Sequence, residues 1–289
     1  MPRVSVVIPV FNGAATIAAC LQAVLGQTGH DSDVIVVDDG SSDATVDVVG
    51  RFPVRLLRHA ANRGAPAARN TGIRAARGEW ILFTDSDCIP SRGWLRALLR
   101  AVDASAAPDA ITAVAGRIMG FPSQAPSARF ASLSGHFDTQ RQLAHPTFPY
   151  AYMANVMYRQ AAIEASGGFD ETVRVYEAPD FHHQVMARYG GHIIYEPRAL
   201  VLHRHPDTWR RYWRQQTGYG SGYAAFLRRH SDKFRWSLRE EALAWAMVFG
   251  YVAAACLPGS RDSSLVRRGR AIKYLAHRLG FGRTYWFGQ

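Results

Sequence analysis

Two carboxylates separated by one residue, Asp85 and Asp87, directly follow an apolar run, Trp80–Thr84, that has the composition of a buried strand. In an extended D-x-D segment both side chains lie on the same side of the chain, so both carboxylates would face one ligand. Hard cations such as Mg²⁺ and Mn²⁺ take carboxylate oxygens as ligands and keep positions open for phosphate oxygens. The pair therefore predicts a site at which a divalent metal holds a phosphate group.

Polar residues also end two earlier apolar runs. Asn12 follows Val4–Val10, and Asp38 and Asp39 follow Val34–Val37. Turn chemistry explains a single aspartate after a strand equally well. In open parallel α/β sheets, however, ligands bind beyond the carboxyl ends of the strands. Three polar strand ends at one edge of a sheet therefore indicate one common site.

The elements that must position these residues alternate between strands and helices. The β-α-β-α order predicts a mostly parallel sheet with helices on both faces. The chain has neither G-x-G-x-x-G after the first strand nor G-x-x-x-x-G-K-[ST], so the usual glycine loops for a dinucleotide or triphosphate are absent. The expected strands are Val4–Val10, Val34–Val37, Val54–Leu57 and Trp80–Thr84, and the expected helices are Thr16–Gly26, Ser41–Val49 and Ala65–Ala76.

The net charge of +11 is unevenly distributed along the 289 residues. Residues 1–202 contain 18 Lys and Arg and 18 Asp and Glu, so their charges cancel. Residues 203–289 contain 16 Lys and Arg and 5 Asp and Glu, and therefore carry the whole net charge of +11. We expect residues 1–206 to form a catalytic domain and residues 207–289 a basic, aromatic helical region that meets an anionic surface. The neutral first part and its acidic crevice argue against nucleic acid as the partner.

The three cysteines include no C-x-x-C pair, which indicates neither a zinc cage nor a disulfide framework. The amino-terminal apolar run is too short for a signal sequence. A second apolar stretch, Ala242–Leu257, has 16 residues and would span about 24 Å as a helix, less than the roughly 30 Å of a bilayer core. This favours a buried helical partner or an interfacial helix over a membrane span.

The segment that follows has the composition of an amphipathic helix on an anionic membrane, with a solvated basic face as the alternative. Its apolar residues fall near one helical face, and arginines and a lysine surround them. The apolar set is Leu265, Ile272, Leu275, Ala276 and Leu279.

Four stretches, in this order over residues 3–205, resemble the family-2 glycosyltransferases of GT-A fold: "VSVVIPVFN", "VIVVDDGSSDAT", "NRGAPAARNTGIRAARGEWILFTDSD" and "GGFDE". One such motif could arise by chance, whereas the ordered set is specific. The resemblance implies a Rossmann-like GT-A sheet. It also implies inverting transfer of a hexosyl group from a nucleotide-sugar, usually a UDP-sugar, with Mn²⁺ or Mg²⁺ as cofactor.

The resemblance also assigns roles on the nucleotide side of the site. It implies that Pro9 and Phe11 line the nucleotide pocket and that Asp39 receives the uracil edge. Arg69, within "GAPAARN", would lie near the nucleotide or the diphosphate. Asp85 would reach the ribose or a metal-bound water.

On the metal side, the resemblance implies Asp87 as a metal ligand, with Asp85 beside it. A histidine after a late strand can complete such a site. His203 directly follows the apolar run of "ALVLHRHP" and is the better candidate, and His205 is the second. Asn155 either binds the donor sugar or acceptor, or ties down a loop.

The sequence departs from the family pattern where the general base is expected. In "YEAPDFHH", aligning Glu177 and Asp180 with the two acidic positions leaves Ala178 in place of the base. Three interpretations remain: Glu177, Asp180 or a histidine (His182 or His183) acts from a shifted position; the acceptor is already an anion; or the protein is impaired. We favour the first, because Glu177 and Asp180 would share one helical face.

The sequence thus predicts an inverting, metal-dependent glycosyltransferase of polysaccharide biosynthesis, peripheral on the cytoplasmic face of the membrane. Its acceptor would be a glycan, a lipid-linked sugar or another cell-envelope component. The alternatives are a transferase to polyprenyl phosphate and a catalytically impaired nucleotide-sugar binder.

Overall fold

The computed structural model describes residues 2–27, 29, 32–135, 137–146, 148–232 and 236–288. The chain divides into two compact units. The sheet unit comprises Met1–Met119 and Phe137–His203, and the helical unit comprises Gly120–His136 and Arg204–Gln289. The helical unit thus begins at Arg204 and also takes up a segment that lies within the expected first domain, 1–206.

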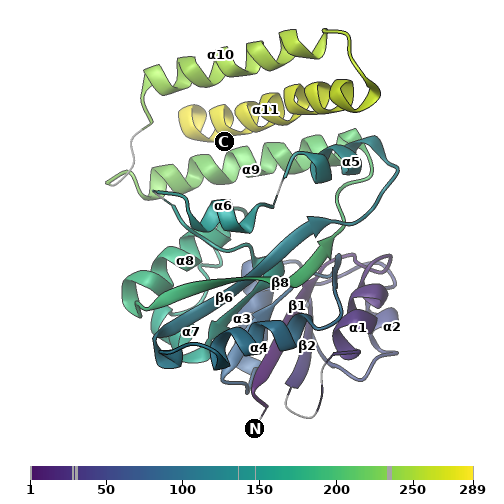
Figure 1. Cartoon of the computed structure of the whole chain (residues 1–289), viewed down its shortest axis with the longest axis vertical. Coiled ribbons are helices and arrows are strands. Elements are labelled where there is room, and N and C mark those ends of the chain that lie inside the picture. The colour runs from purple at the N-terminus through teal and green to yellow at the C-terminus, as the bar shows by residue number, and fades with distance from the viewer. Residues whose placement is uncertain are drawn as a thin grey trace. The chain divides into compact units, whose positions relative to one another are not determined.

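The sheet has eight strands in the order β3-β2-β1-β4-β7-β6-β8-β5 (Figure 1). Strand β1 pairs in parallel with β2 and β4, and β2 pairs in parallel with β3. Strand β7 is antiparallel to β4 and β6, and β5 is antiparallel to β8. The strands are β1 (Val4–Val10), β2 (Ser32–Asp38), β3 (Arg55–Arg58), β4 (Trp80–Phe83), β5 (Cys88–Pro90), β6 (Ile111–Gly120), β7 (Val156–Arg159) and β8 (His192–His203).

Helices cover both faces of this sheet, as the strand-helix order predicts. Alternate residues of β1 enter different core clusters: Val6 and Ile8 pack on one side and Val7 on the other. The predicted α/β class is therefore confirmed. The α-helices of this unit are α1 (Ile17–Leu25), α2 (Thr45–Val49), α3 (Ala65–Ala75), α4 (Trp94–Asp103), α6 (Thr139–Leu143), α7 (Gln160–Ser166) and α8 (Glu177–Arg188).

Helix α3 lies unusually close to the centre of the sheet. A Cβ atom on Gly72 would come within 2.3 Å of Cγ1 of Val7, so only glycine permits this approach. The contact fixes α3 against β1 and thereby places the side chains of the first turns of α3 near the carboxyl ends of the strands.

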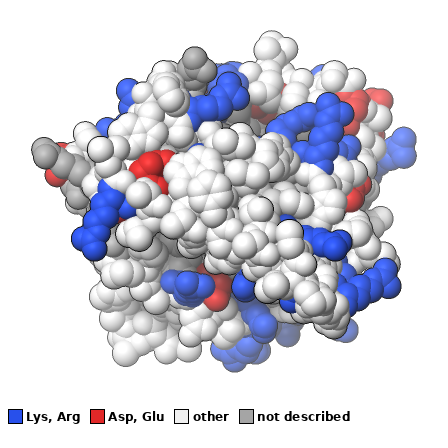
Figure 2. All heavy atoms as spheres, turned by 90° about the horizontal axis from the view of Figure 1, so that it is seen from above, with Lys and Arg blue, Asp and Glu red and all other residues white. Residues whose placement is uncertain are grey.

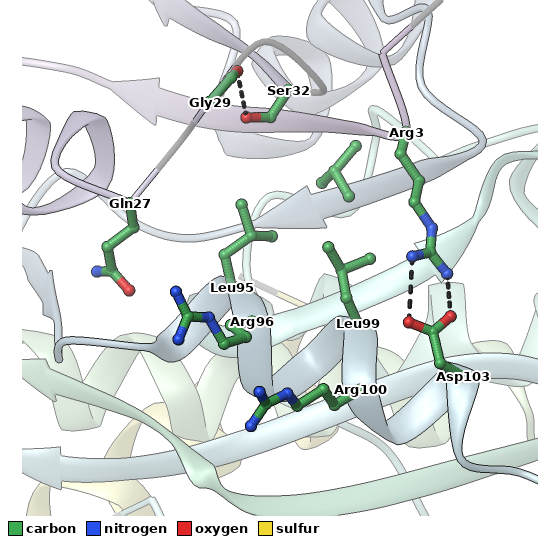
Figure 3. Close-up of a pocket in the computed structure, with 10 residues that line it drawn as sticks. Arg3, Gln27, Gly29, Ser32, Leu95, Arg96, Leu99, Arg100 and Asp103 are labelled. Carbon is green, nitrogen blue, oxygen red and sulfur yellow. Dashed lines mark hydrogen bonds and ion pairs between the residues drawn. The ribbon is translucent and has the colours of Figure 1, made fainter.

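A hollow of about 450 Å³ lies at the opposite edge of the sheet (Figure 3). Its lining includes Val4 and Ser32, the first residues of β1 and β2, together with arginines of α4. The Arg3 guanidinium donates hydrogen bonds to the Asp103 carboxylate at its rim. Because this hollow is at the amino ends of the strands, it is not part of the predicted site.

The helical unit is built around α11 (Arg261–Phe287), which packs against α5 (Pro126–Leu133), α9 (Trp209–Arg229) and α10 (Leu238–Ala255). Figure 1 shows α11 between α9 and α10. A Cβ atom on Gly220 of α9 would lie 1.9 Å from the carbonyl oxygen of His277, and one on Gly280 would lie 2.0 Å from that of Thr217. Glycines thus let α9 and α11 approach closely.

Part of the apolar stripe of α11 faces into the helical unit, whereas Leu279 is 41% exposed. Leu265 and Ile272 pack on Phe130 and Tyr212, and Ala276 is fully buried. The expectation that this stripe lies on a membrane is therefore wrong for these residues, because α5 and α9 already cover them. Within the described residues, none of the helices combines the length and the apolar composition needed to cross a bilayer.

His182, one of the candidate bases, is buried on the inner side of α8. Its Nδ1 atom lies 3.0 Å from the hydroxyl of Tyr158 on β7. Burial, with a smaller contribution from His183, lowers the pKa of His182 to about 4. The imidazole is therefore neutral at physiological pH, and its burial beside Tyr158 keeps it from an acceptor hydroxyl.

We expect His182 to make folding stability depend on pH. The unfolded chain binds this proton near pH 6.5, whereas the folded chain binds it only near pH 4. Between these values the unfolded state holds more protons, so stability falls as pH falls, by up to about 3 kcal/mol for this residue. Urea unfolding at pH 7 and pH 4.5 measures the loss. His182→Gln should reduce it, and the exposed control His192→Gln should not; an undiminished loss in His182→Gln contradicts the assignment.

Candidate active site

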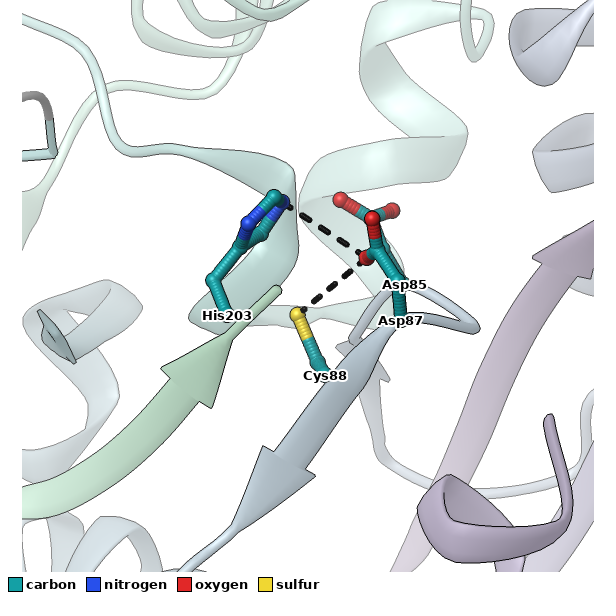
Figure 4. Close-up of side chains that lie close together, drawn as sticks. All are labelled: Asp85, Asp87, Cys88 and His203. Atoms are coloured by element: carbon teal, nitrogen blue, oxygen red, sulfur yellow. Dashed lines mark hydrogen bonds and ion pairs between the residues drawn. The ribbon is translucent and has the colours of Figure 1, made fainter. Parts of the chain in front are cut away.

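Four potential ligand groups gather at the carboxyl edge of the sheet: Asp85, Asp87, Cys88 and His203, whose donor atoms lie within 4.8 Å of one another (Figure 4). The antiparallel pairing of β5 with β8 sets Cys88 opposite His203. As a result, Nε2 of His203 lies 3.6 Å from Oδ1 of Asp87. The structure therefore brings together the three residues predicted for the metal. His205, the second candidate, falls in the helical unit.

The D-x-D segment is a turn and not extended chain, so that expectation is wrong. The amide of Cys88 donates a hydrogen bond to the carbonyl oxygen of Asp85 at 3.0 Å. The reason is that the chain must reverse between the end of β4 and the start of β5, which pairs with β8. The turn brings its two ends together, and the Asp85 and Asp87 carboxylates meet there even without an extended backbone.

Cys88 is a member of this group that the sequence analysis missed. Burial raises the pKa of its thiol well above the ordinary value, and the charges of Asp87 and Asp85 raise it further. The group therefore stays a neutral thiol, and its S–H donates to Oδ1 of Asp87 at 3.8 Å. In this structure it acts on Asp87 as a hydrogen-bond donor.

The chemistry of this donor set fits a divalent cation. Burial raises the pKa of the Asp87 carboxyl and Asp85 raises it further, while His203 has the opposite effect. A cation beside the carboxylate would favour its charged form. Two carboxylates and one imidazole are ligands that Mn²⁺ accepts readily and Mg²⁺ accepts through the carboxylates.

Arg69 links the two acidic parts of the site. Its guanidinium is buried and donates to Oδ1 of Asp85 at 2.9 Å and to Oε1 of Glu177 at 2.6 Å. Burial alone would lower the pKa of Arg69, but the charges of Asp85 and Glu177 outweigh it, and the pKa is raised. The guanidinium also lies 5.7 Å from the ring of Phe169. Arg69 therefore joins the start of α8 to the aspartate pair.

Asp39 is almost fully enclosed by its own surroundings. Its carboxylate accepts hydrogen bonds from the backbone amides of Arg63 and Gly64, and Oδ1 lies 2.6 Å from Nδ1 of His59. These contacts fix the loop that leads into α3. The structure thus places Asp39 where it positions the helix that carries Arg69, and its contact with a uracil edge stays a prediction.

Pro9 and Phe11 mark the carboxyl end of β1. Pro9 is buried in the strand, whereas the Phe11 side chain is 48% exposed. Asn12, the next residue, has φ of 50°, a conformation that few residues other than glycine adopt. Its Oδ1 accepts from the amide of Ser42 at 2.9 Å, which ties the ends of β1 and β2 together.

Asn155 is fully buried and its amide is occupied. Its Nδ2 donates to the carbonyl oxygens of Arg117 and Ala199, both at 2.8 Å, and its Oδ1 accepts from Nε1 of Trp94 at 2.7 Å. These contacts join β6, β8 and α4. These contacts agree with the alternative interpretation, in which Asn155 ties down local structure. A contact of Asn155 with the sugar or the acceptor stays a prediction.

The predicted base candidates Glu177 and Asp180 both lie in the first turn of α8. The residue before the helix, Tyr176, has φ of 71°, so the chain enters α8 through a strained conformation. Glu177 remains partly exposed next to Arg69, whereas Asp180 is buried and accepts from Nε2 of Gln184 at 2.8 Å. Ala178 packs against the core cluster of this side of the sheet.

Solved structures with the same fold include glycosyltransferases. The mannosyltransferase PcManGT from Pyrobaculum calidifontis, in complex with GDP-Man and Mn²⁺, matches with a TM-score of 0.69 and 20% identity over all of this chain and 88% of that one. S. aureus TarS 1-349 in complex with UDP matches with a TM-score of 0.54 and 19% identity over all of this chain and 92% of that one. The GT-A fold implied by the motifs is confirmed.

Curated relatives are also glycosyltransferases or act in polysaccharide synthesis. Pre-mycofactocin glycosyltransferase of Mycobacterium tuberculosis is 36% identical over 238 residues, 80% of this chain and 48% of that protein. Succinoglycan biosynthesis protein ExoO of Rhizobium meliloti is 34% identical over 212 residues, 70% of this chain and 61% of that protein. The chain thus spans about half to three fifths of the length of these two relatives.

The sequence model described as Glycosyl transferase family 2 matches residues 5–167. This range contains nearly all of β1, the whole of β2, β3 and β4, the aspartate pair and Arg69. Because it covers more than half of the 289 residues, and the resemblance and the fold agree with it, the chain belongs to glycosyl transferase family 2.

Proposed function

We propose that this enzyme transfers a hexosyl group with inversion from a UDP-sugar to a glycan, lipid-linked or other cell-envelope acceptor. The observation that carries the proposal is the meeting of Asp85, Asp87 and His203 within 4.8 Å at the carboxyl edge of the sheet. In the proposed site these three residues hold Mn²⁺ or Mg²⁺. Solved structures of this fold in complex with GDP-Man and Mn²⁺ and with UDP-GlcNAc support this choice of ligands.

In the proposed complex, the sheet unit supplies both the surface that binds the nucleotide and the groups that offset the charge of its diphosphate. The exposed ring of Phe11 offers an apolar surface on which a uracil base would stack. The bound metal would offset the negative charge that builds up on the departing nucleotide diphosphate. Arg69 keeps Asp85 oriented toward that position through its 2.9 Å hydrogen bond.

The proposed transfer step is an in-line displacement. The acceptor oxygen forms a bond to the anomeric carbon, the bond from that carbon to the diphosphate oxygen breaks, and the electron pair leaves with the nucleotide diphosphate. The acceptor hydroxyl gives its proton to a carboxylate. Glu177 is the better candidate for this base, because it is partly exposed and stands beside Arg69 and Asp85, whereas Asp180 is buried.

A transferase to polyprenyl phosphate is the second candidate function, and Ala178 is the observation that favours it. Alanine stands where the family resemblance places the base, and a phosphate acceptor is already ionised and needs none. An impaired enzyme that still binds its donor is the remaining alternative. The three candidate functions can be separated by measuring turnover of UDP-sugars with a hydroxyl acceptor, with polyprenyl phosphate and with no acceptor.

Peripheral attachment to the inner face of the cell membrane is also part of the proposal. The helical unit contains 17 Lys and Arg and 5 Asp and Glu, which gives a net charge of +12. The sheet unit contains 17 Lys and Arg and 18 Asp and Glu, so its charges nearly cancel. A unit with this excess of positive charge would be attracted to anionic lipid headgroups.

Metal dependence can be tested at Asp87. We expect Asp87→Ala to weaken Mn²⁺-dependent UDP binding by at least about tenfold, the loss that even an outer-sphere partner of a metal typically causes. Asp103→Ala removes an exposed carboxylate at the far edge of the sheet and serves as the matched control. Calorimetry with UDP and Mn²⁺ gives the affinities. Equal affinity in wild type and Asp87→Ala would exclude Asp87 as a ligand, and turnover that survives EDTA would exclude the metal.

The base can be identified by comparing three variants. Glu177→Gln should lower kcat on a hydroxyl acceptor by about 10²–10⁴-fold, the usual contribution of a general base. Asp180→Asn should lower it less, because that carboxyl is buried. Ala178→Asp should raise kcat, because it restores a carboxylate at the position that the family pattern predicts. If kcat is unchanged in all three variants, the shifted base is wrong and an ionised acceptor becomes the better account.

A further inference from the structure

Helix α10 packs on the helical unit by a side that includes a carboxylate. Its inner side carries Glu241, whose carboxylate accepts hydrogen bonds from Nε1 of Trp236 at 2.9 Å and Nε1 of Trp245 at 2.8 Å. The same carboxylate accepts from Arg278 of α11 at 2.6 Å. The polar groups that anchor α10 thus lie inside the helical unit.

The inner side is completed by residues at helical spacing from Glu241. Val248 is fully buried, and Tyr251 stacks on Tyr274 of α11 with ring centroids 4.6 Å apart. Residues 241, 245, 248 and 251 follow each other at intervals of four, three and three, which defines one face of a helix. Helix α10 therefore packs on α11 by this face.

Apart from the charged residues Arg239 and Glu240 in its first turn, the rest of the α10 surface is exposed and apolar. We name it the outer face of α10; with the short segment after the helix, its large exposed side chains are Leu238, Leu243, Met247, Phe249, Val252 and Leu257. Exposed alanines and glycine fill the spaces between them. Contiguous apolar patches of this kind are rare on proteins that have no partner there.

Arginines follow this apolar surface along the chain. Figure 2 shows the molecule from above, with uncharged side chains over much of the middle of the view and Lys, Arg and fewer Asp and Glu around them. Four positions after Leu257, Arg261 begins α11 and lines a hollow of about 460 Å³ with Arg129 and Arg268. Trp209, Leu265 and Ile272 form the apolar part of that lining. Arg129 is paired with Asp262 at 2.7 Å, and the guanidinium groups of Arg261 and Arg268 beside this hollow suit a lipid phosphate.

We infer that the outer face of α10 lies in the headgroup region of an anionic bilayer, with the arginines at the start of α11 bound to lipid phosphates. The inference deepens the proposed membrane attachment and assigns it to α10 in place of α11. A second copy of the chain fits the face less well, because two helical units of charge +12 would repel each other. Nucleic acid would use the arginines and leave the apolar face uncovered.

The test compares binding of the full chain to sedimented vesicles of phosphatidylcholine with and without phosphatidylglycerol. We expect binding only with phosphatidylglycerol, weakened by salt. Leu243→Gln should lower vesicle binding about tenfold, because one large apolar side chain no longer leaves water. Its matched control is Leu133→Gln on α5, since these two leucines are 60% and 53% exposed. Arg268→Gln should lower binding, and Arg51→Gln in the sheet unit should not.

Three results would overturn the inference. The first is a wild-type protein that binds neither kind of vesicle, and the second is a Leu133→Gln variant that loses as much vesicle binding as Leu243→Gln. The third is a dimer, detected by light scattering, that Leu243→Gln dissociates, because the outer face of α10 would then bind a second copy of the chain. Binding of UDP with Mn²⁺ is measured on the same samples. If vesicle binding is lost and UDP binding is intact, only the inference about α10 is affected. If UDP binding is lost and vesicle binding is intact, the proposed function is affected.

Discussion

The buried guanidinium of Arg69 is the constraint on which the site depends. A buried charge is costly unless opposite charges and hydrogen bonds compensate it, and loss of one partner leaves an uncompensated ion. Arg69 satisfies this requirement with Asp85 and Glu177, at 2.9 and 2.6 Å. One side chain therefore holds the end of β4 and the start of α8 at a fixed separation, and the metal group and the base candidate become parts of one site.

Other contacts serve to place Arg69 itself. Asp39 holds the backbone of Arg63 and Gly64 at the entry to α3, and Gly72 lets α3 lie directly on Val7. On the opposite side of the ion pair, the chain enters α8 through the strained residue Tyr176. Strained residues persist where the surrounding structure over-determines them, and such places cluster at functional sites. The contacts of the sheet unit thus hold three carboxylates, those of Asp85, Asp87 and Glu177, close to one arginine, Arg69.

Much of the fold and the core of the site could be predicted from the sequence, because they follow local patterns. Apolar runs gave β1, β2 and β4 nearly to the residue, and the polar groups at their ends gave Asp85 and Asp87, whereas His203 came from the family resemblance. What could not be predicted depends on pairing between distant segments. The turn at Asp85 and the presence of Cys88 follow from the register of β5 on β8.

The helices of the C-terminal region show the same limit. The amphipathic pattern of α11 indicated an apolar face correctly, but the pattern does not say whether protein or lipid covers that face. In the structure, Leu265 and Ile272 meet Phe130 and Tyr212, whereas α10, which has no charged residue after Glu241, keeps its outer face exposed. The glycines of α9 likewise depend on a distant partner, since they make room for α11.

The insertion of Gly120–His136 into the helical unit has a consequence for synthesis on the ribosome. Phe130 of α5 packs on Tyr212 of α9, which emerges 82 residues later, and on Leu265 and Ile272 of α11, which emerge later still. The apolar side of α5 therefore waits, unpaired, while the second half of the sheet unit is made. The contacts of α5 with α11 can form only after residues 265–272 have left the ribosome, and until then the apolar side of nascent α5 stays exposed to aggregation.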